Sequence, residues 1–287
     1  MTLARSCEVV ATRSGIPVIL HRASGEVMHP GTGPAVEARE LYVLPSRLAE
    51  RLRQGGPGNA QGANLVLFDV GLGAASNAIA AWRVSESLPK AARRLEIVSF
   101  DHDLDALKLA LEPQHAEAFG FSEKDGAQPA ATALLTDGRH ETPRTTWRLA
   151  FGEFLDSLTR EPPASADIVF WDMFTRGANP HLWTVSAFRS LRSACRAGAT
   201  LHTYTSATSA RSGLLLAGFA VGVGGRIGDR EQTTVAATNP ADLAQPLDAR
   251  WLARLARSSA AFPTDVPDDD HSRAEALARV RAQPQFS

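Results

Sequence analysis

The stretch "LVLFDVGLGAASNAIAAW", residues 65–82, decides the fold of this 287-residue chain. It starts as an apolar run, turns through Gly71 and Gly73, and continues into small and apolar residues. The pattern predicts a buried strand over residues 65–70 and a helix over residues 76–84. Glycines at such a turn let a ligand approach the backbone, and the first helical turn offers unpaired N–H groups. A strand–turn–helix unit of this kind is typical of nucleotide-binding proteins.

The rest of the chain repeats this order of strand and helix, which predicts a mostly parallel sheet in an α/β, Rossmann-like fold. Two final short strands would add an antiparallel edge. Residues 113–144, rich in Ala, Gly and Pro, are expected to form a partly helical insertion. The further strands are expected over residues 95–100, 147–151, 167–171, 200–205, 221–225 and 233–237, and the further helices over 104–111, 154–158, 185–197 and 208–217.

The two ends of the chain carry additional elements. Residues 7–20 alternate around Ser14-Gly15 and predict a hairpin, residues 25–34 a loop, and residues 35–52 helix in their first and last parts. A Gly-rich connector over residues 53–64 follows. Near the C-terminus, residues 248–263 predict an amphipathic helix, and residues 266–280 a helix with an acidic start. We therefore expect three parts: an N-terminal hairpin and helix (1–60), a Rossmann-like core (61–240) and a helical tail (241–287).

Composition places the chain among ordinary globular proteins. Hydrophobic residues make up 44% and charged residues 21%, and the net charge of −1 gives no global basic field that would attract nucleic acid. The two cysteines, Cys7 and Cys195, suggest neither a disulfide framework nor a metal site. We see no signal peptide and no apolar stretch long enough to cross a membrane, so we expect a cytoplasmic protein with no membrane partner. The oligomeric state stays open.

Acidic residues stand at or beside the ends of the first four core strands: Asp69, Asp101, Glu153 and Asp172. Because the carboxyl ends of parallel strands share one edge of a sheet, a nucleoside can lie across these side chains. Asp101 is suited to accept hydrogen bonds from ribose hydroxyls, and Glu153 from an adenine amino group. The last acid, Asp172, would then meet the reacting group, where a carboxylate can orient an amine and take its proton. Taken alone, such an Asp is often only a turn former or helix cap.

Two cofactors fit this arrangement, NAD and S-adenosylmethionine. The dinucleotide fingerprint G-x-G-x-x-G is incomplete because Ser76 takes the third glycine position. Asp69 beside the turn disfavours a pyrophosphate and tolerates the ammonium group of a methionine chain. S-adenosylmethionine is therefore favoured over NAD, and a tight turn that binds no ligand stays as the plainest alternative.

Several motifs together resemble the methyltransferase domain of MnmC, and most closely its stand-alone, single-domain relatives. They are "FDVGLGAASNAIAAW" (68–82), "DIVFWDMFTRGANPHLWTVSAFRSL" (167–191), "TLHTYTSATSARSGLLLAGF" (200–219), "GVGGRIGDREQTTVAA" (222–237), "GEVMHPGTGPAVEARELYV" (25–43) and the tail "HSRAEALARVRAQPQF" (271–286). The resemblance implies a class I, Rossmann-like methyltransferase that transfers a methyl group from S-adenosylmethionine to the aminomethyl nitrogen of a wobble uridine in tRNA. The flavin domain of full-length MnmC has no counterpart in these residues, so no FAD is expected.

By motif position, the resemblance implies a role for individual residues. Asp172 is the expected catalytic acid facing the amine. The expected cofactor site comprises Asp69, Gly71, Gly73, Asn77, Asp101 and Glu153, the last standing where the family usually has Asp. The substrate side is expected to include Glu37, Phe174, Arg176 and Asn179, and no metal is expected.

The sequence departs from the family on the substrate side, which leaves other functions open. Arg176 replaces a proline, Ala178 a frequent lysine, and Ala75 the third glycine of the turn. A methyltransferase for a small amine or another nucleic acid is the main alternative. A non-catalytic nucleotide- or RNA-binding module and an NAD-dependent oxidoreductase are the others. If tRNA binds, we expect a local basic face drawn from Arg189, Arg192, Arg196, Arg211, Arg226 and Arg230.

Overall fold

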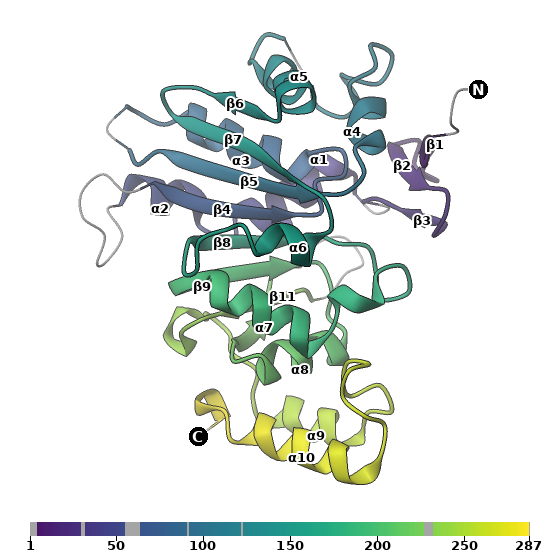
Figure 1. The fold of residues 1–287 in the computed structure, drawn as a ribbon, viewed down its shortest axis with the longest axis vertical. Coiled ribbons are helices and arrows are strands. Elements are labelled where there is room, and N and C mark those ends of the chain that lie inside the picture. The colour runs from purple at the N-terminus through teal and green to yellow at the C-terminus, as the bar shows by residue number, and fades with distance from the viewer. Residues whose placement is uncertain are drawn as a thin grey trace.

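The computed structural model describes residues 5–29, 32–54, 64–90, 92–121, 123–226 and 232–286. Its centre is an eight-stranded sheet in the order β10-β11-β9-β8-β4-β5-β7-β6 (Figure 1). The five inner strands from β9 to β7 run parallel, and antiparallel strands lie at both ends. The strands are β4 (Leu65–Val70), β5 (Leu95–Asp101), β6 (Arg139–Glu141), β7 (Thr145–Phe151), β8 (Ala166–Trp171), β9 (Cys195–Thr203), β10 (Ala220–Val223) and β11 (Thr234–Ala237). The predicted α/β fold class with an antiparallel edge is confirmed.

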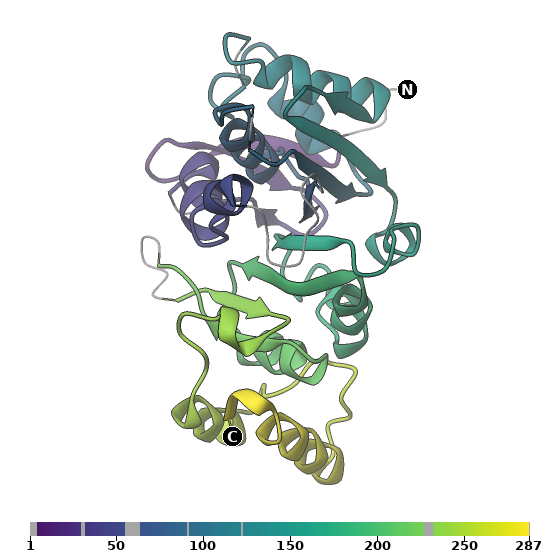
Figure 2. The same cartoon turned by 90° about the vertical axis from the view of Figure 1, so that its left-hand side faces the viewer.

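The sheet is buried on both faces, which explains why β4 is apolar without alternation. Leu65 and Leu67 pack into one hydrophobic cluster, while Val66, Phe68 and Val70 pack into the other. The first cluster lies under η1 (Ala38–Val43), α2 (Leu48–Arg53), α3 (Ser76–Glu86), α4 (Asp105–Ala110) and α5 (Ala127–Asp137). The second lies under α6 (Phe154–Leu158), α7 (Val185–Ala194) and α8 (Thr208–Leu216), on the opposite side of the sheet (Figures 1 and 2).

Two predictions about the core are wrong in part. The helix expected over residues 185–197 ends at Ala194, because the next residues pair with β8, with Cys195 opposite Ala166. The insertion over residues 113–144 is partly helical, as predicted, but it also supplies the outer strand β6. Gly138, at φ 70°, ends α5 in the left-handed region and turns the chain into β6. A three-residue exposed strand has too little alternation to be recognised from sequence.

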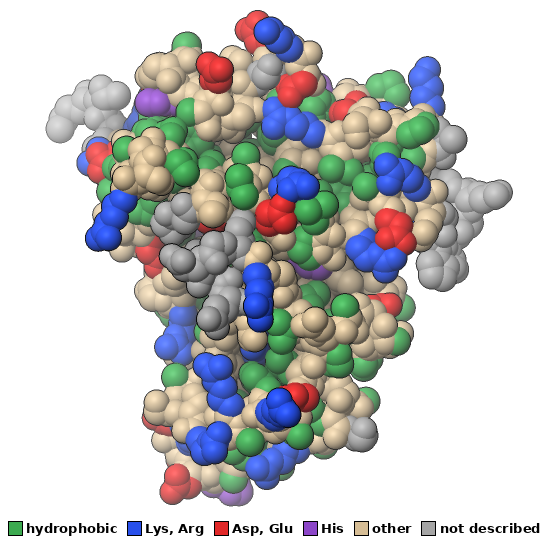
Figure 3. Space-filling view, turned by 180° about the vertical axis from the view of Figure 1, so that it is seen from behind, with side chains coloured by type: hydrophobic (Ala, Val, Ile, Leu, Met, Phe, Trp, Pro, Cys, Tyr) green, Lys and Arg blue, Asp and Glu red, His purple; other side chains and the backbone are tan. Residues whose placement is uncertain are grey.

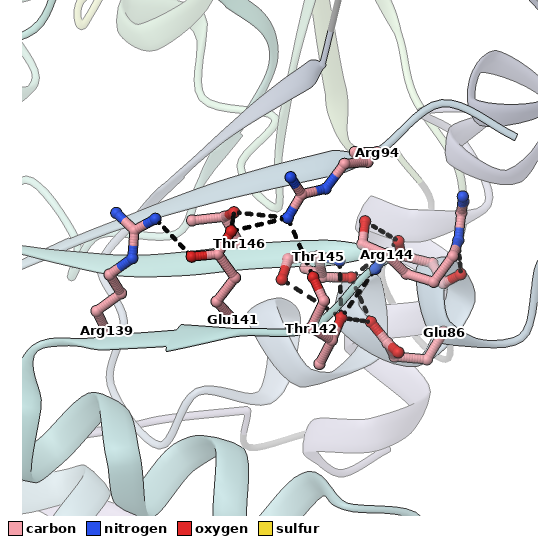
Figure 4. A network of polar contacts seen from close by, with 9 residues as sticks. Glu86, Arg94, Arg139, Glu141, Thr142, Arg144, Thr145 and Thr146 are labelled. Atoms are coloured by element: carbon pink, nitrogen blue, oxygen red, sulfur yellow. Dashed lines mark hydrogen bonds and ion pairs between the residues drawn. The ribbon is translucent and has the colours of Figure 1, made fainter. Parts of the chain in front are cut away.

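A polar network fastens this outer edge of the sheet to the strands and helix beside it (Figure 4). Glu141 of β6 accepts hydrogen bonds from Arg139 and Arg94, at 2.8 and 3.0 Å. Glu86, at the end of α3, accepts from Thr142 and Thr145 at 2.7 and 2.6 Å. These bonds pair the polar side chains at this edge with partners inside the molecule. Edge strands need such protection because one of their sides has no neighbouring strand.

The N-terminal segment forms a separate three-stranded sheet. The predicted hairpin is present as β1 (Cys7–Ala11) and β2 (Pro17–His21), and β3 (Glu26–Val27) pairs with β2 where a loop was expected. A short helix, α1 (Pro34–Glu37), leads into the π-helix η1, which continues the helical path through the middle of the segment. The connector over residues 53–64 and the proposed boundary at residue 60 fall largely outside the described residues.

The C-terminal segment adds two helices, α9 (Ala249–Arg257) and α10 (Asp270–Arg281), at the β10 end of the sheet (Figure 1). Trp251, Leu255 and Val280 pack into the same hydrophobic cluster as α7 and α8. The packing is therefore continuous from the core to the C-terminal helices, and the division into 61–240 and 241–287 stays a prediction. No helix in the described ranges has the length and apolar character needed to cross a membrane.

Candidate functional site

A pocket of about 270 Å³ opens at the carboxyl ends of β4 and β8. From β4 the chain continues to β5 on one side of the sheet, and it later returns to β8 on the other side of β4. The pocket therefore lies at the switch point of the sheet, where open α/β sheets bind ligands. The lining comes from five places: the N-terminal sheet with the segment through α1, the glycine turn with the start of α3, the end of β5, the loop after β8, and the residue after β9. It comprises Glu26–His29, Glu37, Gly71–Gly73, Ser76, Asn77, Asp101, His102, Asp172–Thr175, Asn179 and Tyr204.

Gly71 is required because the glycine turn presses against the end of β8. Its φ is +92°, and a Cβ atom there would lie 2.7 Å from the carbonyl oxygen of Asp172. Gly73, at φ +51°, would place a Cβ 3.3 Å from the sulfur of Met28. At both positions the missing side chain leaves bare backbone at the pocket wall, and at Gly71 it lets the glycine turn lie directly against Asp172.

Asp172 is held by two donors, one on each carboxylate oxygen. The Tyr42 hydroxyl donates to Oδ1 at 2.6 Å, and the Asn77 amide donates to Oδ2 at 2.7 Å. Burial, and then the Asp172 charge, raise the pKa of Tyr42 well above its usual value, so Tyr42 stays a donor. Asn77, predicted on the cofactor side, therefore also positions the predicted catalytic acid.

A second pair of side chains lies beside Asp172. His29 places Nδ1 3.3 Å from Glu37 Oε2 and Nε2 3.9 Å from Asp172 Oδ2. His29 has φ 53°, in the left-handed region that non-glycine residues adopt rarely. Glu37, predicted on the substrate side, therefore lines the pocket next to His29.

Sequence reasoning missed Tyr42 and His29. Tyr42 lies in the π-helix η1, a geometry often found at functional sites, but a six-residue π-helix has no sequence pattern of its own. His29 lies in a stretch that reads only as a loop. Neither residue carries a local signal for its position beside Asp172.

Asp101 lies between the pocket and a smaller hollow of about 90 Å³. Its carboxylate accepts backbone N–H bonds from Gly73, His102 and Asp103, at 3.0, 2.8 and 3.1 Å. The smaller hollow is lined on one side by Glu153, beside Gly152, and has the apolar rings of Phe100 and Phe154 in its wall. Asp101 therefore borders both hollows, and Glu153 borders the smaller one, whose aromatic wall suits a flat apolar ring.

Asp69 lies beneath the pocket and does not line it. Its side chain is buried and accepts a hydrogen bond from Ser99 Oγ at 2.7 Å, while Oδ1 has no partner among the described residues. Burial raises the pKa of Asp69 to about 7. Asp69, predicted to bind the cofactor, therefore lies behind the residues that line the pocket.

The predicted substrate-side residues separate into two groups. Phe174 and Asn179 line the pocket, and the Phe174 ring stacks on His21 with centroids 4.9 Å apart. Arg176 lies outside it, in an adjoining groove, and its guanidinium donates to Ser209 Oγ at 3.3 Å.

The predicted basic face does not form as a unit. Arg211 is buried and donates to Thr233 and Thr234. Arg192 stands in the last turn of α7, and Arg196 follows at the start of β9, bound to Asp167. Both therefore lie toward the amino ends of the parallel strands, at the opposite edge of the sheet from the pocket, while Arg230 is outside the described residues.

The residues present fit a nucleoside that carries an amino-acid chain. The glycine turn provides a wall of backbone that a ligand can approach closely, Asp101 an acceptor, and the smaller hollow an apolar slot. The buried Ser76 Oγ and Asn77 Oδ1 lack partners among the described residues, and both residues belong to the pocket lining. In the described ranges, no three His, Cys, Asp or Glu side chains gather so as to hold a metal ion.

Comparisons with known proteins agree with this geometry. Residues 128–239 match a family described as S-adenosyl-L-methionine-dependent methyltransferase. The chain is 31% identical over 243 residues to the tRNA 5-methylaminomethyl-2-thiouridine biosynthesis bifunctional protein MnmC of Methylibium petroleiphilum, covering 83% of this chain and 36% of that protein. It is 33% identical over 218 residues to MnmC of Ralstonia nicotianae, covering 74% and 32%. It thus spans about a third of the length of these relatives.

A solved structure shares the whole fold. MnmC2 from Aquifex aeolicus superposes with a TM-score of 0.70 at 24% identity, covering 97% of this chain and 86% of that one. This likeness extends over both ends of the chain and so includes the N-terminal sheet and the C-terminal helices.

Proposed function

Because the chain carries an S-adenosyl-L-methionine-dependent methyltransferase domain related to that of MnmC, we propose that it methylates the aminomethyl nitrogen of a wobble uridine in tRNA. The observation that carries this proposal is the placement of Asp172. This carboxylate lies at the switch point of the sheet, against the glycine turn, with a fixed donor on each oxygen. A positioned carboxylate of this kind can orient an amine and accept its proton.

The cofactor would be held by residues on the β4 and β5 ends. The backbone of Gly71 and Gly73 would contact its amino-acid chain with Asn77 nearby, Asp101 would accept from the ribose, and Glu153 would lie near the adenine. S-adenosylmethionine supplies a methyl group on a positively charged sulfur. The acidic pocket lining, with Glu26, Glu37, Asp101 and Asp172, favours such a cation.

Asp172 would orient the accepting amine and take its proton. Tyr42 and Asn77 each use one lone pair on separate oxygens, so lone pairs on both oxygens remain for an amine N–H. The amine must be neutral to use its lone pair, and Asp172 can accept or relay the proton that an ammonium group carries. Tyr42 cannot take this proton because its hydroxyl stays protonated. Its contribution is to fix the carboxylate in place.

A small-amine methyltransferase is the second candidate. The net charge of −1 and the acidic pocket lining favour a small cationic acceptor as well as a modified nucleoside. The two candidates are separated by incubating the protein with methyl-labelled S-adenosylmethionine and tRNA that lacks the modification, with small amines in parallel. Label in tRNA nucleosides supports the proposal, whereas label only in small amines supports the second candidate.

Cofactor binding is tested separately by thermal unfolding. S-adenosylmethionine and its demethylated product should raise the melting temperature, because they bind only the folded state. NAD should not. Asp101→Ala should remove most of the shift, since Asp101 borders both hollows. Stabilisation by NAD alone would contradict the methyltransferase function.

A further inference from the structure

A groove leads from the pocket toward the C-terminal helices. Its volume is about 480 Å³, and it shares Thr175 and Tyr204 with the pocket lining. Arg176 lies on one side of it, and Ser258 and Ala260, which directly follow α9, lie on the other. The C-terminal end of α9 therefore borders a continuous path that begins at the candidate active site.

The outward face of α9 carries three arginines. Arg250, Arg254 and Arg257 are exposed and spaced by four and three residues, so they share one side of the helix. Residues 249–257 contain no acidic residue, and the preceding Asp248 caps the helix by accepting from the backbone N–H of Arg250 and Trp251. Within the described part of the chain, no carboxylate pairs with these three guanidinium groups. We call this set the α9 arginine ridge.

The ridge lies on a basic part of the surface. Figure 3, the view from behind, shows Lys and Arg side chains gathered over the lower, C-terminal elements with few acidic side chains between them. Figure 2 places α9 on this side of the molecule. Burial, and then the charge of Arg254, lower the pKa of Arg211 to about 10.

We infer that the α9 arginine ridge binds the phosphodiester backbone of an RNA acceptor while the target nucleotide enters the pocket along the groove. The inference rests on the proposed function. Arginine clusters bind phosphates strongly, and phosphate contacts set the register of a nucleic acid without reading its sequence. A membrane surface fits less well, because α9 packs its large apolar side chains Trp251, Leu252 and Leu255 against the core and turns arginines outward.

The test compares two triple variants with equal loss of charge. Arg250→Ala/Arg254→Ala/Arg257→Ala removes the ridge, and Arg53→Ala/Arg279→Ala/Arg281→Ala removes exposed arginines from α2 and α10. Alanine maintains helix propensity, so both should fold. Binding of fluorescent tRNA is measured from low to high salt, together with methyl transfer, S-adenosylmethionine binding and binding to phosphatidylserine vesicles.

The ridge variant should bind tRNA at least 10-fold more weakly near 0.1 M salt. The slope of log K against log salt should fall by about 2, because each phosphate contact contributes roughly 0.7 to 0.9. The KM for tRNA should rise, with kcat and S-adenosylmethionine binding unchanged, and the control variant should stay within about twofold of the wild type.

Four results would overturn the inference. If the ridge variant binds tRNA as tightly as the wild type, and the wild type methylates tRNA, the ridge is not the RNA-binding surface and the proposed function is retained. Equal weakening in both variants would show that only net charge matters. Loss of binding to phosphatidylserine vesicles, with tRNA binding retained, would assign the ridge to a membrane. A wild-type protein that neither binds nor methylates tRNA would refute the ridge and the proposed function together.

Discussion

At the scale of single residues, the surroundings of Asp172 can accommodate an amide of the same shape in place of its charged carboxylate. Tyr42 donates to one oxygen and Asn77 to the other, while Asn77 Oδ1 has no partner among the described residues. A flipped Asn77 amide could therefore accept from an amide introduced in place of the Asp172 carboxylate. This makes Asp172→Asn a clean test of the carboxylate charge.

We expect Asp172→Asn to lower methyl transfer by about 100-fold or more, the scale for loss of a positioned acid or base. The melting shift with S-adenosylmethionine should change little, because the expected ribose acceptor is Asp101. Higher pH should restore part of the rate by supplying neutral amine from solution. Wild-type rates at neutral pH would show that the carboxylate only shapes the loop through Asn179.

Asp69 should make stability depend on pH. Its folded pKa is about 7, and the unfolded value is about 3.9, so the folded state retains a proton that the unfolded state releases between these pH values. The stabilisation is full below about pH 4 and is lost as pH rises toward 7. At about 1.36 kcal/mol per unit, the loss amounts to roughly 2–4 kcal/mol.

Asp69→Asn removes this dependence because the amide is neutral throughout. Urea unfolding without cofactor should show the variant more stable than wild type at pH 8, with the difference shrinking toward pH 5. A difference that is equal at both pH values would mean that Asp69 does not titrate in this range.

At the scale of elements, the glycine turn between β4 and α3 fixes the distance to β8. Gly71→Ala should cost about 1–2 kcal/mol for its positive φ and roughly 1–3 more for overpacking against the Asp172 carbonyl. Gly218→Ala is the matched control, because Gly218 has φ +91° with nothing within 4 Å of an added Cβ. Urea unfolding should show only the smaller cost there, and only Gly71→Ala should also lose S-adenosylmethionine binding. Equal losses of unfolding free energy in the two variants would mean that β8 shifts to make room for the added methyl group.

At the scale of the whole molecule, the last residues attach the C-terminal helices to the sheet. Gln285 accepts from the Val221 N–H at 2.7 Å and donates to the Val221 carbonyl at 3.0 Å, so its side chain pairs with the outer strand β10. Phe286 stacks beside Trp251 of α9, with ring planes 4° apart. These contacts connect the tail, β10 and α9 into one packed unit.

Gln285→Ala should lower the free energy of unfolding by about 2 kcal/mol, since it leaves the buried Val221 N–H without its partner and removes a bond to the Val221 carbonyl, which keeps only the Leu247 N–H. Gln283→Ala, which removes one bond to the Leu215 carbonyl, should cost less than half as much. Comparable losses in chemical unfolding would show that the tail is held by its packing and not by the Gln285 pairing.

The sequence by itself determined the order of strands and helices in the core and the acids at the strand ends. β4, α6 and the glycine turn were predicted from residues adjacent in the chain, because strand burial, helix periodicity and turn chemistry are local. The same locality placed Asp101 and Asp172 at one edge of a parallel sheet. The motifs were sufficient to recognise a methyltransferase domain of the MnmC type.

Only the tertiary structure decided what surrounds Asp172 and where the groove leads. Tyr42 and Asp172 are 130 positions apart, and His29 and Arg257 stand near opposite ends of the chain. No local pattern encodes such distances, because they follow from how the N-terminal sheet, the π-helix and the C-terminal helices pack on the sheet. The separation of Arg192 and Arg196 from the pocket has the same origin: α7 runs antiparallel to the strands and carries its last turn to the far edge.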